Sequence, residues 1–332
     1  MKPTISVAMT TYNGAAYIGE QLESLACQTV PPIEMQIGDD GSTDETEAIV
    51  KSFARTAPFP VTYVRNSERL FFGENSIRTA LRCSGDWISF CDQDDVWDPR
   101  KFEWATDAIC QGPPDLNLLV HNAFLTDEKL KPGKLLYDYP AGETVTGRLD
   151  LPPEWYSWGF TQIFRASLVR DIPSARRVSF PWHEHRNAHD VWIALLANST
   201  GSVLRTNQSL ALFRRHAGVV SGQVMGQLSL AREGSAYAQR ATYLRDVAAT
   251  LKQCAESVDR GTAILLSDAA ARIGHFAEQL DERALAYSDP KLARRLSHIG
   301  SLVEQGAYVG SSRWRFGTAR LLKDLLCATR LL

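Results

Sequence analysis

The sequence contains few cysteines, no long apolar run and no secretion signal. Its six cysteines are scattered along 332 residues without a CxxC pair, so we expect reduced thiols. No apolar run reaches the roughly 18 residues that a membrane-spanning helix needs. The N-terminus enters a strand pattern at residue 5 without a basic segment or a cleavage signal. We therefore expect a cytoplasmic protein.

The sequence also lacks an excess of charge of either sign. It carries 36 Lys and Arg against 38 Asp and Glu, which gives a formal net charge of −2. Because nucleic-acid-binding proteins usually show a basic patch or stripe, we expect no nucleic-acid partner and only local contacts with phosphate, such as those of a small nucleotide. The 44% hydrophobic content predicts an ordinary globular chain with a sizeable core.

What the sequence does contain is an alternation of short apolar runs and helix-like segments over its first 125 residues. We expect strands at 5–9, 33–38, 61–64, 87–91 and 116–120. The first helix carries its apolar face over 18–26 with Asn13 as its cap, the second opens with a capping box of Ser42 and Glu45, and the third covers 75–81. This alternation predicts an α/β fold with a mostly parallel sheet flanked by helices.

The pattern changes to long helical segments after residue 222. They cover about 224–258 and 263–305 and contain neither a phosphate-binding loop nor a metal-ligand cluster. We therefore predict an α/β domain over residues 1–222 and a helical C-terminal region over 223–332. That region supports the acceptor site, forms a homodimer or contacts the membrane.

The last segment, residues 313–332, combines leucines and Trp314 with several basic residues and a single acid, Asp324. Such an amphipathic segment is typical of a helix that lies on the inner face of the plasma membrane. It is equally typical of a terminal helix that docks on the body of the protein through its apolar face. The sequence leaves both interpretations open.

Two acidic clusters follow expected strands directly, Asp39–Asp44 (DDGSTD) and Asp92–Asp95 (DQDD). Ligands of open α/β sheets bind beyond the carboxyl ends of the strands, so we expect the clusters to converge on one ligand. Isolated acidic turns are usually solvated, because Asp favours turns. Three carboxylates within four residues repel one another, however, and Mn²⁺ and Mg²⁺ prefer oxygen ligands, so the second cluster favours a divalent metal.

These motifs together resemble those of family 2 glycosyltransferases. The resemblance rests on Thr10–Gly14 (TTYNG) and the two acidic clusters in this order, and it covers about the first 220 residues. Phe90–Trp97 (FCDQDDVW) and His189–Trp192 (HDVW) resemble the bacterial rhamnosyltransferase-like branch.

The resemblance implies a GT-A fold with a Rossmann-like sheet, a nucleotide-diphospho-sugar donor and a divalent metal, Mn²⁺ or Mg²⁺. It also implies inverting transfer of the sugar to a hydroxyl of a cell-surface glycan or lipid-linked acceptor during polysaccharide biosynthesis. dTDP-rhamnose is the donor that the branch suggests, and a UDP-hexose is the alternative. The chain lacks the QxxRW signature of processive members, which favours the addition of one or a few sugars.

On the donor side, the resemblance implies that Asp40 accepts a hydrogen bond from a pyrimidine base. It also implies that Thr10 lies at the edge of that base and that Tyr12 stacks on it. A carboxylate that accepts from an imide N–H fits both thymine and uracil. It further implies that the basic run Arg214-Arg215-His216, which follows the apolar segment 210–213, holds the departing diphosphate.

At the metal, the resemblance implies that Asp94 is the direct ligand. Asp92 then faces the ribose or a metal-bound water, and Asp95 orients the sugar or serves as a second ligand. A metal held this way would neutralise the charge that develops on the departing diphosphate.

On the acceptor side, the resemblance implies that Asp190 is the general base, with His189, Trp158 and Gly159 beside the acceptor. A base of this kind takes the proton of the attacking hydroxyl opposite the leaving group. The alternatives are a helix cap for Asp190, a turn for Gly159 and core packing for the aromatic side chain. The histidines of His183–Arg186 do not form an HExxH pattern, so we interpret this segment as a polar acceptor loop.

Two rival functions start from the same residues. The sequence from Asp92 to Val96 also fits the short motif of an aspartyl phosphotransferase, but that motif belongs after a first strand and here follows a fourth. A non-catalytic nucleotide-sugar or glycan-binding subunit would use the same fold, because fold alone does not fix activity. Asp190 speaks against this second rival.

Overall fold

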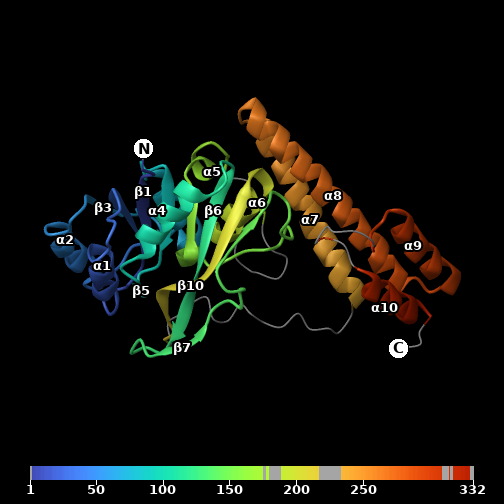
Figure 1. Cartoon of the computed structure of the whole chain (residues 1–332), viewed down its shortest axis with the longest axis horizontal. Helices are drawn as coiled ribbons and strands as arrows, with labels where there is room; N and C mark the ends of the chain where they lie inside the picture. The colour runs from blue at the N-terminus through green and yellow to red at the C-terminus, as the bar shows by residue number, and fades with distance from the viewer. Residues whose placement is uncertain are drawn as a thin grey trace. The chain divides into compact units, whose positions relative to one another are not determined.

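The computed structural model describes residues 2–174, 177–178, 188–216, 233–308, 314 and 317–329 (Figure 1). The chain divides into two compact units. The first comprises Met1–Arg148, Glu154–Ala175 and Asn187–Val220, and the second comprises Leu149–Pro153, Arg176–Arg186 and Ser221–Leu332.

The first unit is built on one mixed sheet with the strand order β3-β2-β1-β4-β9-β6-β10-β5. Strands β3, β2, β1 and β4 are mutually parallel, β9 lies antiparallel between β4 and β6, and β6 is parallel to β10. The strands of this order are β1 (Ile5–Thr11), β2 (Glu34–Asp39), β3 (Val61–Arg65), β4 (Trp87–Cys91), β5 (Val96–Trp97), β6 (Leu116–Thr126), β9 (Gln162–Arg165) and β10 (Ser202–Arg214). Short strands β7 (Pro132–Leu135) and β8 (Glu143–Thr146) pair with β6 and β10.

Helices cover both faces of this sheet because buried side chains on its strands alternate between the faces. Val7 and Met9 of β1 pack in one core cluster with Leu22 of α1, Val50 of α2 and Phe102 of α4. On the other face α3 contacts β1 and β2 and packs against α5 and α6. The helices are α1 (Ile18–Ala26), α2 (Thr46–Ala54), α3 (Phe71–Leu81), α4 (Lys101–Gln111), α5 (Ser167–Arg170) and α6 (His189–Thr200). The expected α/β architecture with a mostly parallel sheet is confirmed.

Both helix caps predicted from the sequence are wrong. Helix α1 begins at Ile18 without a side-chain cap, and Asn13 adopts a left-handed φ of 48° while its Oδ1 accepts from the Thr43 amide at 2.8 Å. Ser42 forms no capping box, because its hydroxyl donates to Asp39 and accepts from the Asn13 amide at 2.8 Å. The polar side chains of these turns therefore bind the neighbouring loop rather than their own helix.

The second unit is helical in its described residues. It contains α7 (Glu233–Ala255), α8 (Arg260–Ser288), α9 (Leu292–Glu304) and α10 (Thr318–Ala328). The expected helix over 263–305 is divided in two, because Pro290 lacks an amide hydrogen and cannot continue α8. Asp259 caps α8 by accepting from the Gly261 and Thr262 amides.

The C-terminal helix α10 docks within the second unit through its one acid. Asp324 is 1% exposed and accepts hydrogen bonds from Arg283 and Tyr287 of α8 and from Tyr308. Leu322, by contrast, is 61% exposed. These contacts support the docked-helix interpretation, while contact with a membrane stays a prediction. No helix among the described residues is both long enough and apolar enough to span a bilayer.

Candidate active site

The candidate site lies where three neighbouring parallel strands end. In the sheet register Thr11 of β1 pairs with Asp39 of β2, and Met9 of β1 pairs with Cys91 of β4. The acidic cluster that follows β2 and the one that follows β4 therefore emerge on either side of the end of β1. Open α/β sheets bind ligands beyond this edge. The two clusters lie side by side there, as expected, while their convergence on one ligand stays a prediction.

Asp40 is held in place by a neighbouring loop. Its side chain is 6% exposed and accepts from the amides of Leu70 at 2.6 Å and Phe71 at 2.8 Å, and from Asn66 Nδ2 at 3.2 Å. Phe71 adopts a φ of 58°, which is unfavourable for a bulky side chain and must be held by its surroundings. Asp40 thus orders this loop at the edge of the crevice.

Tyr12 presents an open aromatic face beside that loop. The ring is 38% exposed, and the guanidinium carbon of Arg69 lies 4.1 Å from its centroid, within cation–π range. Thr10, two residues earlier on β1, is half-buried and pairs with Gly38. The ring is therefore available to stack on a planar group, and Arg69 occupies one of its faces.

The three acids after β4 have different surroundings. Asp95 is fully buried, and its Oδ1 accepts from the Arg214 amide at 3.3 Å while its Oδ2 is buried without a hydrogen-bond partner. Asp94 Oδ2 lies 2.9 Å from His216 Nε2. Burial raises the pKa of Asp92 to about 7, and the charges of Asp94 and Asp190 add to the shift. The cluster thus contains one buried carboxylate oxygen, Asp95 Oδ2, that lacks a hydrogen-bond partner.

Burial also raises the pKa of Asp95 well above its usual value, with the charges of Asp94 and Asp92 as further causes. Within the described residues no set of three His, Cys, Asp or Glu side chains is arranged to hold a metal by itself. A divalent cation that keeps one or two protein carboxylates beside substrate phosphates nevertheless fits this oxygen donor set and the unpartnered Asp95 oxygen. The expected roles of Asp94 as the direct ligand, of Asp92 on the ribose side or against a metal-bound water and of Asp95 as a second ligand stay predictions.

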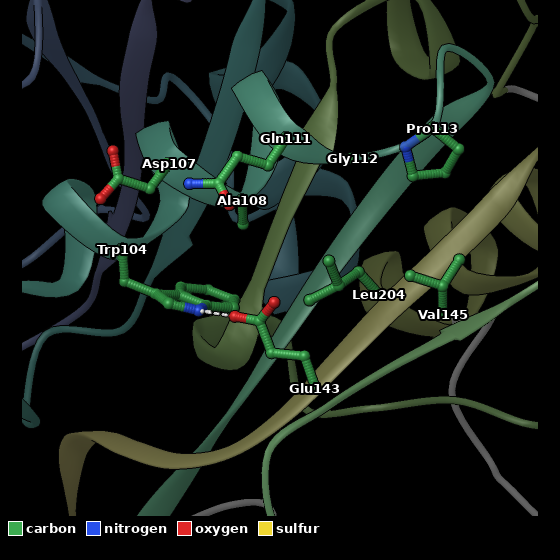
Figure 2. A pocket seen from close by; sticks show the side chains of 9 residues that line it. All are labelled: Trp104, Asp107, Ala108, Gln111, Gly112, Pro113, Glu143, Val145 and Leu204. Carbon is green, nitrogen blue, oxygen red and sulfur yellow. Dashed lines mark hydrogen bonds between the residues drawn. The ribbon is translucent and has the colours of Figure 1, made fainter.

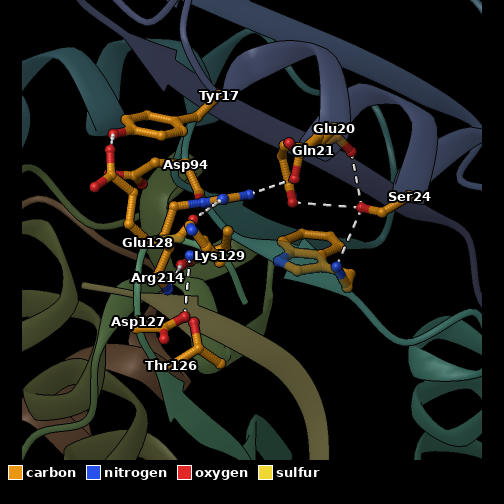
Figure 3. A network of polar contacts seen from close by, with 12 residues as sticks. Tyr17, Glu20, Gln21, Ser24, Asp94, Thr126, Asp127, Glu128, Lys129 and Arg214 are labelled. Carbon is orange, nitrogen blue, oxygen red and sulfur yellow. Dashed lines mark hydrogen bonds and ion pairs between the residues drawn. The ribbon is translucent and has the colours of Figure 1, made fainter. Parts of the chain in front are cut away.

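Arg214 is buried and donates its hydrogen bonds to groups within the protein. It is 3% exposed, and its guanidinium donates to the carbonyl oxygens of Asp94 at 2.9 Å and Glu128 at 2.6 Å and to Glu20 Oε2 at 2.5 Å (Figure 3). Tyr17, whose hydroxyl donates to Glu128 at 2.8 Å, lies at the edge of the same network. Arg214 joins the loop after β4 to α1 and to the loop after β6.

The basic run predicted to act together on a diphosphate is therefore divided, and the prediction is wrong for Arg214. His216 lies against Asp94, with its ring centroid 4.5 Å from that of Tyr17. Arg215 is exposed, and its amide donates to the Thr126 carbonyl at 3.1 Å. Of the three basic residues, Arg215 has the exposed side chain, and His216 is the one whose side chain contacts a carboxylate of the cluster.

Asp190 is a buried carboxylate at the N-terminus of α6. It is 8% exposed and accepts from the Val191 amide at 2.8 Å and from the Gly159 amide. Burial raises its pKa to about 6, although these backbone donors lower it. Its charge in turn raises the pKa of Asp92, so the two carboxylates belong to one electrostatic neighbourhood. A titratable pair of this kind in a crevice is typical of functional sites.

The three residues expected beside the acceptor pack inward to different degrees. His189 is 7% exposed, and its ring centroid lies 4.4 Å from that of Phe90. A Cβ at Gly159 would lie 2.5 Å from His189 Nε2, so the imidazole is the neighbour that requires glycine there. Trp158 is half-buried, and its amide donates to the Tyr137 hydroxyl at 2.7 Å. Their contact with an acceptor stays a prediction, while the close approach of His189 is a packing reason for glycine at position 159.

Lys101 is a site residue that the sequence analysis missed. Its ammonium is fully buried, donates to the Phe160 carbonyl at 2.8 Å and lies 3.1 Å from the Trp97 ring centroid. Burial lowers its pKa well below the usual value, while the charges of Cys91, Asp95 and Asp92 oppose this shift. No local pattern predicts a buried lysine in the first turn of a helix, because its partners come from elsewhere in the chain. The segment His183–Arg186 lies outside the described residues.

The cavity in Figure 2 is far from these acids. It has a volume of about 410 Å³ and is lined by Trp104 and Asp107 of α4 and by Glu143, Val145 and Leu204 of the neighbouring strands, among others. Leu204, which lines the cavity, lies near the start of β10, and Arg214, which contacts the acids, is the last residue of this strand. At about 3.3 Å per residue, the two residues are roughly 30 Å apart along the strand. We place the site at the acid clusters, because the cavity lies at the opposite edge of the sheet.

Comparisons with known proteins identify the family of this chain. An uncharacterized glycosyltransferase of Haemophilus influenzae is 34% identical over 119 residues, which are 36% of this chain and 38% of that protein. The putative teichuronic acid biosynthesis glycosyltransferase TuaG of Bacillus subtilis is 32% identical over 103 residues, or 31% of this chain and 40% of that protein. The match therefore covers less than half the length of either curated relative.

The fold is similar to that of S. aureus TarS residues 1–349, solved in complex with UDP. The TM-score is 0.55 at 17% identity, over 98% of this chain and 90% of that one. This similarity confirms the GT-A-type fold. The family described as Glycosyl transferase family 2 matches residues 6–172, which is half of the sequence and includes both acidic clusters. The chain therefore belongs to glycosyl transferase family 2.

Proposed function

We propose that this protein is an inverting, metal-dependent glycosyltransferase that moves a sugar from a nucleotide-diphospho-sugar to an acceptor hydroxyl. The observation that carries the proposal is the buried Asp190 carboxylate, whose pKa is raised to about 6, in one electrostatic neighbourhood with Asp92. A base with a pKa near the working pH and an oxygen-rich metal site are the two devices that such a transfer needs.

The nucleoside binds at the end of β1 and β2. Tyr12 stacks on the base, and the base displaces Arg69 from the ring face that it now covers. Asp40 accepts from the imide N–H of the base, for which its carboxylate oxygens retain acceptor capacity beside the loop amides. Thr10 lies along the edge of the same site.

Asp94 would hold the metal, Asp95 would serve as a second ligand, and Asp92 would lie on the ribose side or against a metal-bound water. When bound, Mn²⁺ or Mg²⁺ neutralises the negative charge of the departing diphosphate. His216 lies against Asp94 and Arg215 follows β10 directly, so both are positioned for the diphosphate oxygens.

Asp190 takes the proton of the acceptor hydroxyl, which then attacks the anomeric carbon opposite the diphosphate. The amides of Val191 and Gly159 orient the carboxylate, and its burial keeps its basicity higher than that of an exposed aspartate. Trp158, Gly159 and His189 form the acceptor side of this position. One displacement with one base inverts the anomeric configuration.

The acceptor we propose is a hydroxyl of a cell-surface glycan or of a lipid-linked glycan, reached on the cytoplasmic side of the membrane. The assignment of TuaG to teichuronic acid biosynthesis supports a role in building a polysaccharide. We propose dTDP-rhamnose as the donor on the resemblance of residues 90–97 and 189–192. A UDP-hexose is the second candidate, because TarS was solved with UDP and with UDP-GlcNAc.

Calorimetric titration with dTDP, UDP and GDP, each with and without Mn²⁺, tests the nucleotide and metal parts of this proposal. We expect a pyrimidine diphosphate to bind at least tenfold more tightly with Mn²⁺, and Asp94→Ala to remove this gain, because one or two carboxylates complete the coordination. Asp98→Ala, a half-exposed acid on the next turn, is the control. Failure of every nucleotide to bind would overturn the function.

The raised pKa of Asp190 predicts a pH dependence of transfer. Below about pH 6 the carboxyl is protonated and cannot accept the hydroxyl proton, so kcat/KM at saturating Mn²⁺ should fall about tenfold per pH unit there and level off above pH 7. Initial rates between pH 4.5 and 8.5 measure this limb. An acid limb centred near pH 4, the usual value of an exposed aspartate, would contradict Asp190 as the base.

A further inference from the structure

The Gln93 side chain joins the two halves of the candidate site. Gln93 stands between Asp92 and Asp94 in the loop after β4, but its amide group reaches the end of β1. Its Oε1 accepts from Thr11 Oγ1 at 2.6 Å and from the Tyr12 amide at 2.9 Å, and its Nε2 donates to the Tyr12 carbonyl at 3.2 Å. The side chain therefore holds the backbone of Tyr12 on both its donor and its acceptor.

The chain around this contact leaves no free space. A Cβ at Gly14 would lie 2.2 Å from Gln93 Oε1 and 2.7 Å from its Cδ. The Gly14 amide also donates to Thr46 Oγ1 at 2.8 Å, and the Ala15 amide donates to Asp44 at 3.0 Å. The turn after β1 is thus fixed to the loop after β2 on one side and to Gln93 on the other.

We propose that Gln93 is a positioning residue that couples nucleoside binding at Tyr12 to cation binding at Asp94. The inference rests on the proposed function. A cation that draws Asp94 into its coordination shell fixes the neighbouring Gln93, and two hydrogen bonds to the Tyr12 backbone, with a third to Thr11, transmit that position to Tyr12. A base stacked on Tyr12 fixes Gln93 in the reverse direction, because thermodynamic coupling between two sites is reciprocal.

The coupling is measured with nucleosides, which lack the diphosphate that would touch the metal directly. Mn²⁺ affinity is determined by electron paramagnetic resonance of free Mn²⁺, with and without saturating uridine or thymidine. In the wild type we expect one nucleoside to raise Mn²⁺ affinity about fivefold or more. In Gln93→Leu this ratio should fall toward one, while Mn²⁺ affinity without nucleoside changes less than about threefold.

Gly14→Ala is a second, independent variant, since its methyl group would occupy the space of Gln93 Oε1. It should lower the ratio of Mn²⁺ affinities with and without nucleoside, as Gln93→Leu does. If Gln93→Leu does not fold, Gly14→Ala still tests the coupling. Gly19→Ala is its matched control, because a Cβ there meets nothing within 4 Å. Gln111→Leu, at an exposed position at the end of α4, is the control for the glutamine.

The outcomes separate the inference from the function on which it rests. Wild-type protein that binds neither Mn²⁺ nor any pyrimidine nucleotide overturns the proposed function and the inference with it. Wild-type protein that binds both without coupling, or variants that retain the wild-type ratio, overturns the role of Gln93 alone. A ratio lost in both Gln93→Leu and Gly14→Ala and kept in both controls supports it.

Discussion

Asp190→Asn is expected to lower kcat of sugar transfer by about 10³-fold, because a positioned general base typically contributes between 10² and 10⁴. This loss corresponds to about 4 kcal/mol of transition-state stabilisation. Asparagine keeps one oxygen to accept from the Val191 and Gly159 amides, so the start of α6 should retain its structure. Nucleotide affinity with Mn²⁺ should change less than about threefold, as calorimetry on the same samples would measure.

Asp259→Asn is the matched control for this prediction. Asp259 also accepts backbone amides at a helix N-terminus, those of Gly261 and Thr262, but it belongs to the helical unit. The control should transfer sugar at the wild-type rate. Full turnover by Asp190→Asn would remove Asp190 as the base, and loss of nucleotide binding together with turnover would indicate a structural role. Retained binding without turnover separates the enzyme from a non-catalytic binding subunit.

The sheet could be predicted because its central strands are buried on both faces. Residues 87–91 are apolar except for Ser89, and the strand observed there has the same bounds as the one expected. Strand β6 continues six residues beyond its predicted end at Val120, because buried polar residues such as His121 and Asn122 interrupt the apolar pattern. Hydrophobic periodicity therefore located these strands better than it located their ends.

The caps failed for a physical reason that recurs at the site. Asn13 and Ser42 have the side chains that usually cap helices, yet each accepts a hydrogen bond from an amide about thirty residues away in the neighbouring loop. A local motif cannot distinguish between these two uses of one side chain. The loops that carry the candidate site are held by such cross-strand contacts.

The acids of the site could be predicted, but the groups that hold them could not. Asp40, Asp92 and Asp190 stand in motifs with recognisable neighbours. Lys101 and Arg214 are buried basic residues whose hydrogen-bond partners are distant in the sequence. Lys101 donates to the Phe160 carbonyl, and Arg214 donates to the Glu128 carbonyl. A lysine at a helix start or an arginine at a strand end is usually exposed, so only the packed structure identifies these two side chains as buried.

Asp324→Ala is expected to lower the free energy of unfolding of the helical unit by roughly 3–5 kcal/mol, the usual cost of removing one partner of a buried ion pair. Asp324 is 1% exposed and accepts from Arg283 Nη2 at 2.7 Å, from the Tyr287 hydroxyl at 2.6 Å and from the Tyr308 hydroxyl at 2.7 Å. Alanine would leave the Arg283 guanidinium, which is 3% exposed in the ion pair, without its counter-charge. Hydrogen exchange of α8 and α10 amides under increasing urea measures this unit separately from the sheet.

Helix α8, which carries Arg283, supplies a matched control, because its Asp281 forms an exposed ion pair with Arg245. Asp281→Ala should cost less than about 1 kcal/mol, since water and salt screen an exposed pair and replace most of its interaction. The two variants share the substitution, the charged partner type and the unit, whereas Asp324 is buried and also accepts from two tyrosine hydroxyls. Equal losses in the two variants would show that burial of the Asp324 pair does not stabilise α10, and protection of α10 amides would then have to come from its apolar contacts alone.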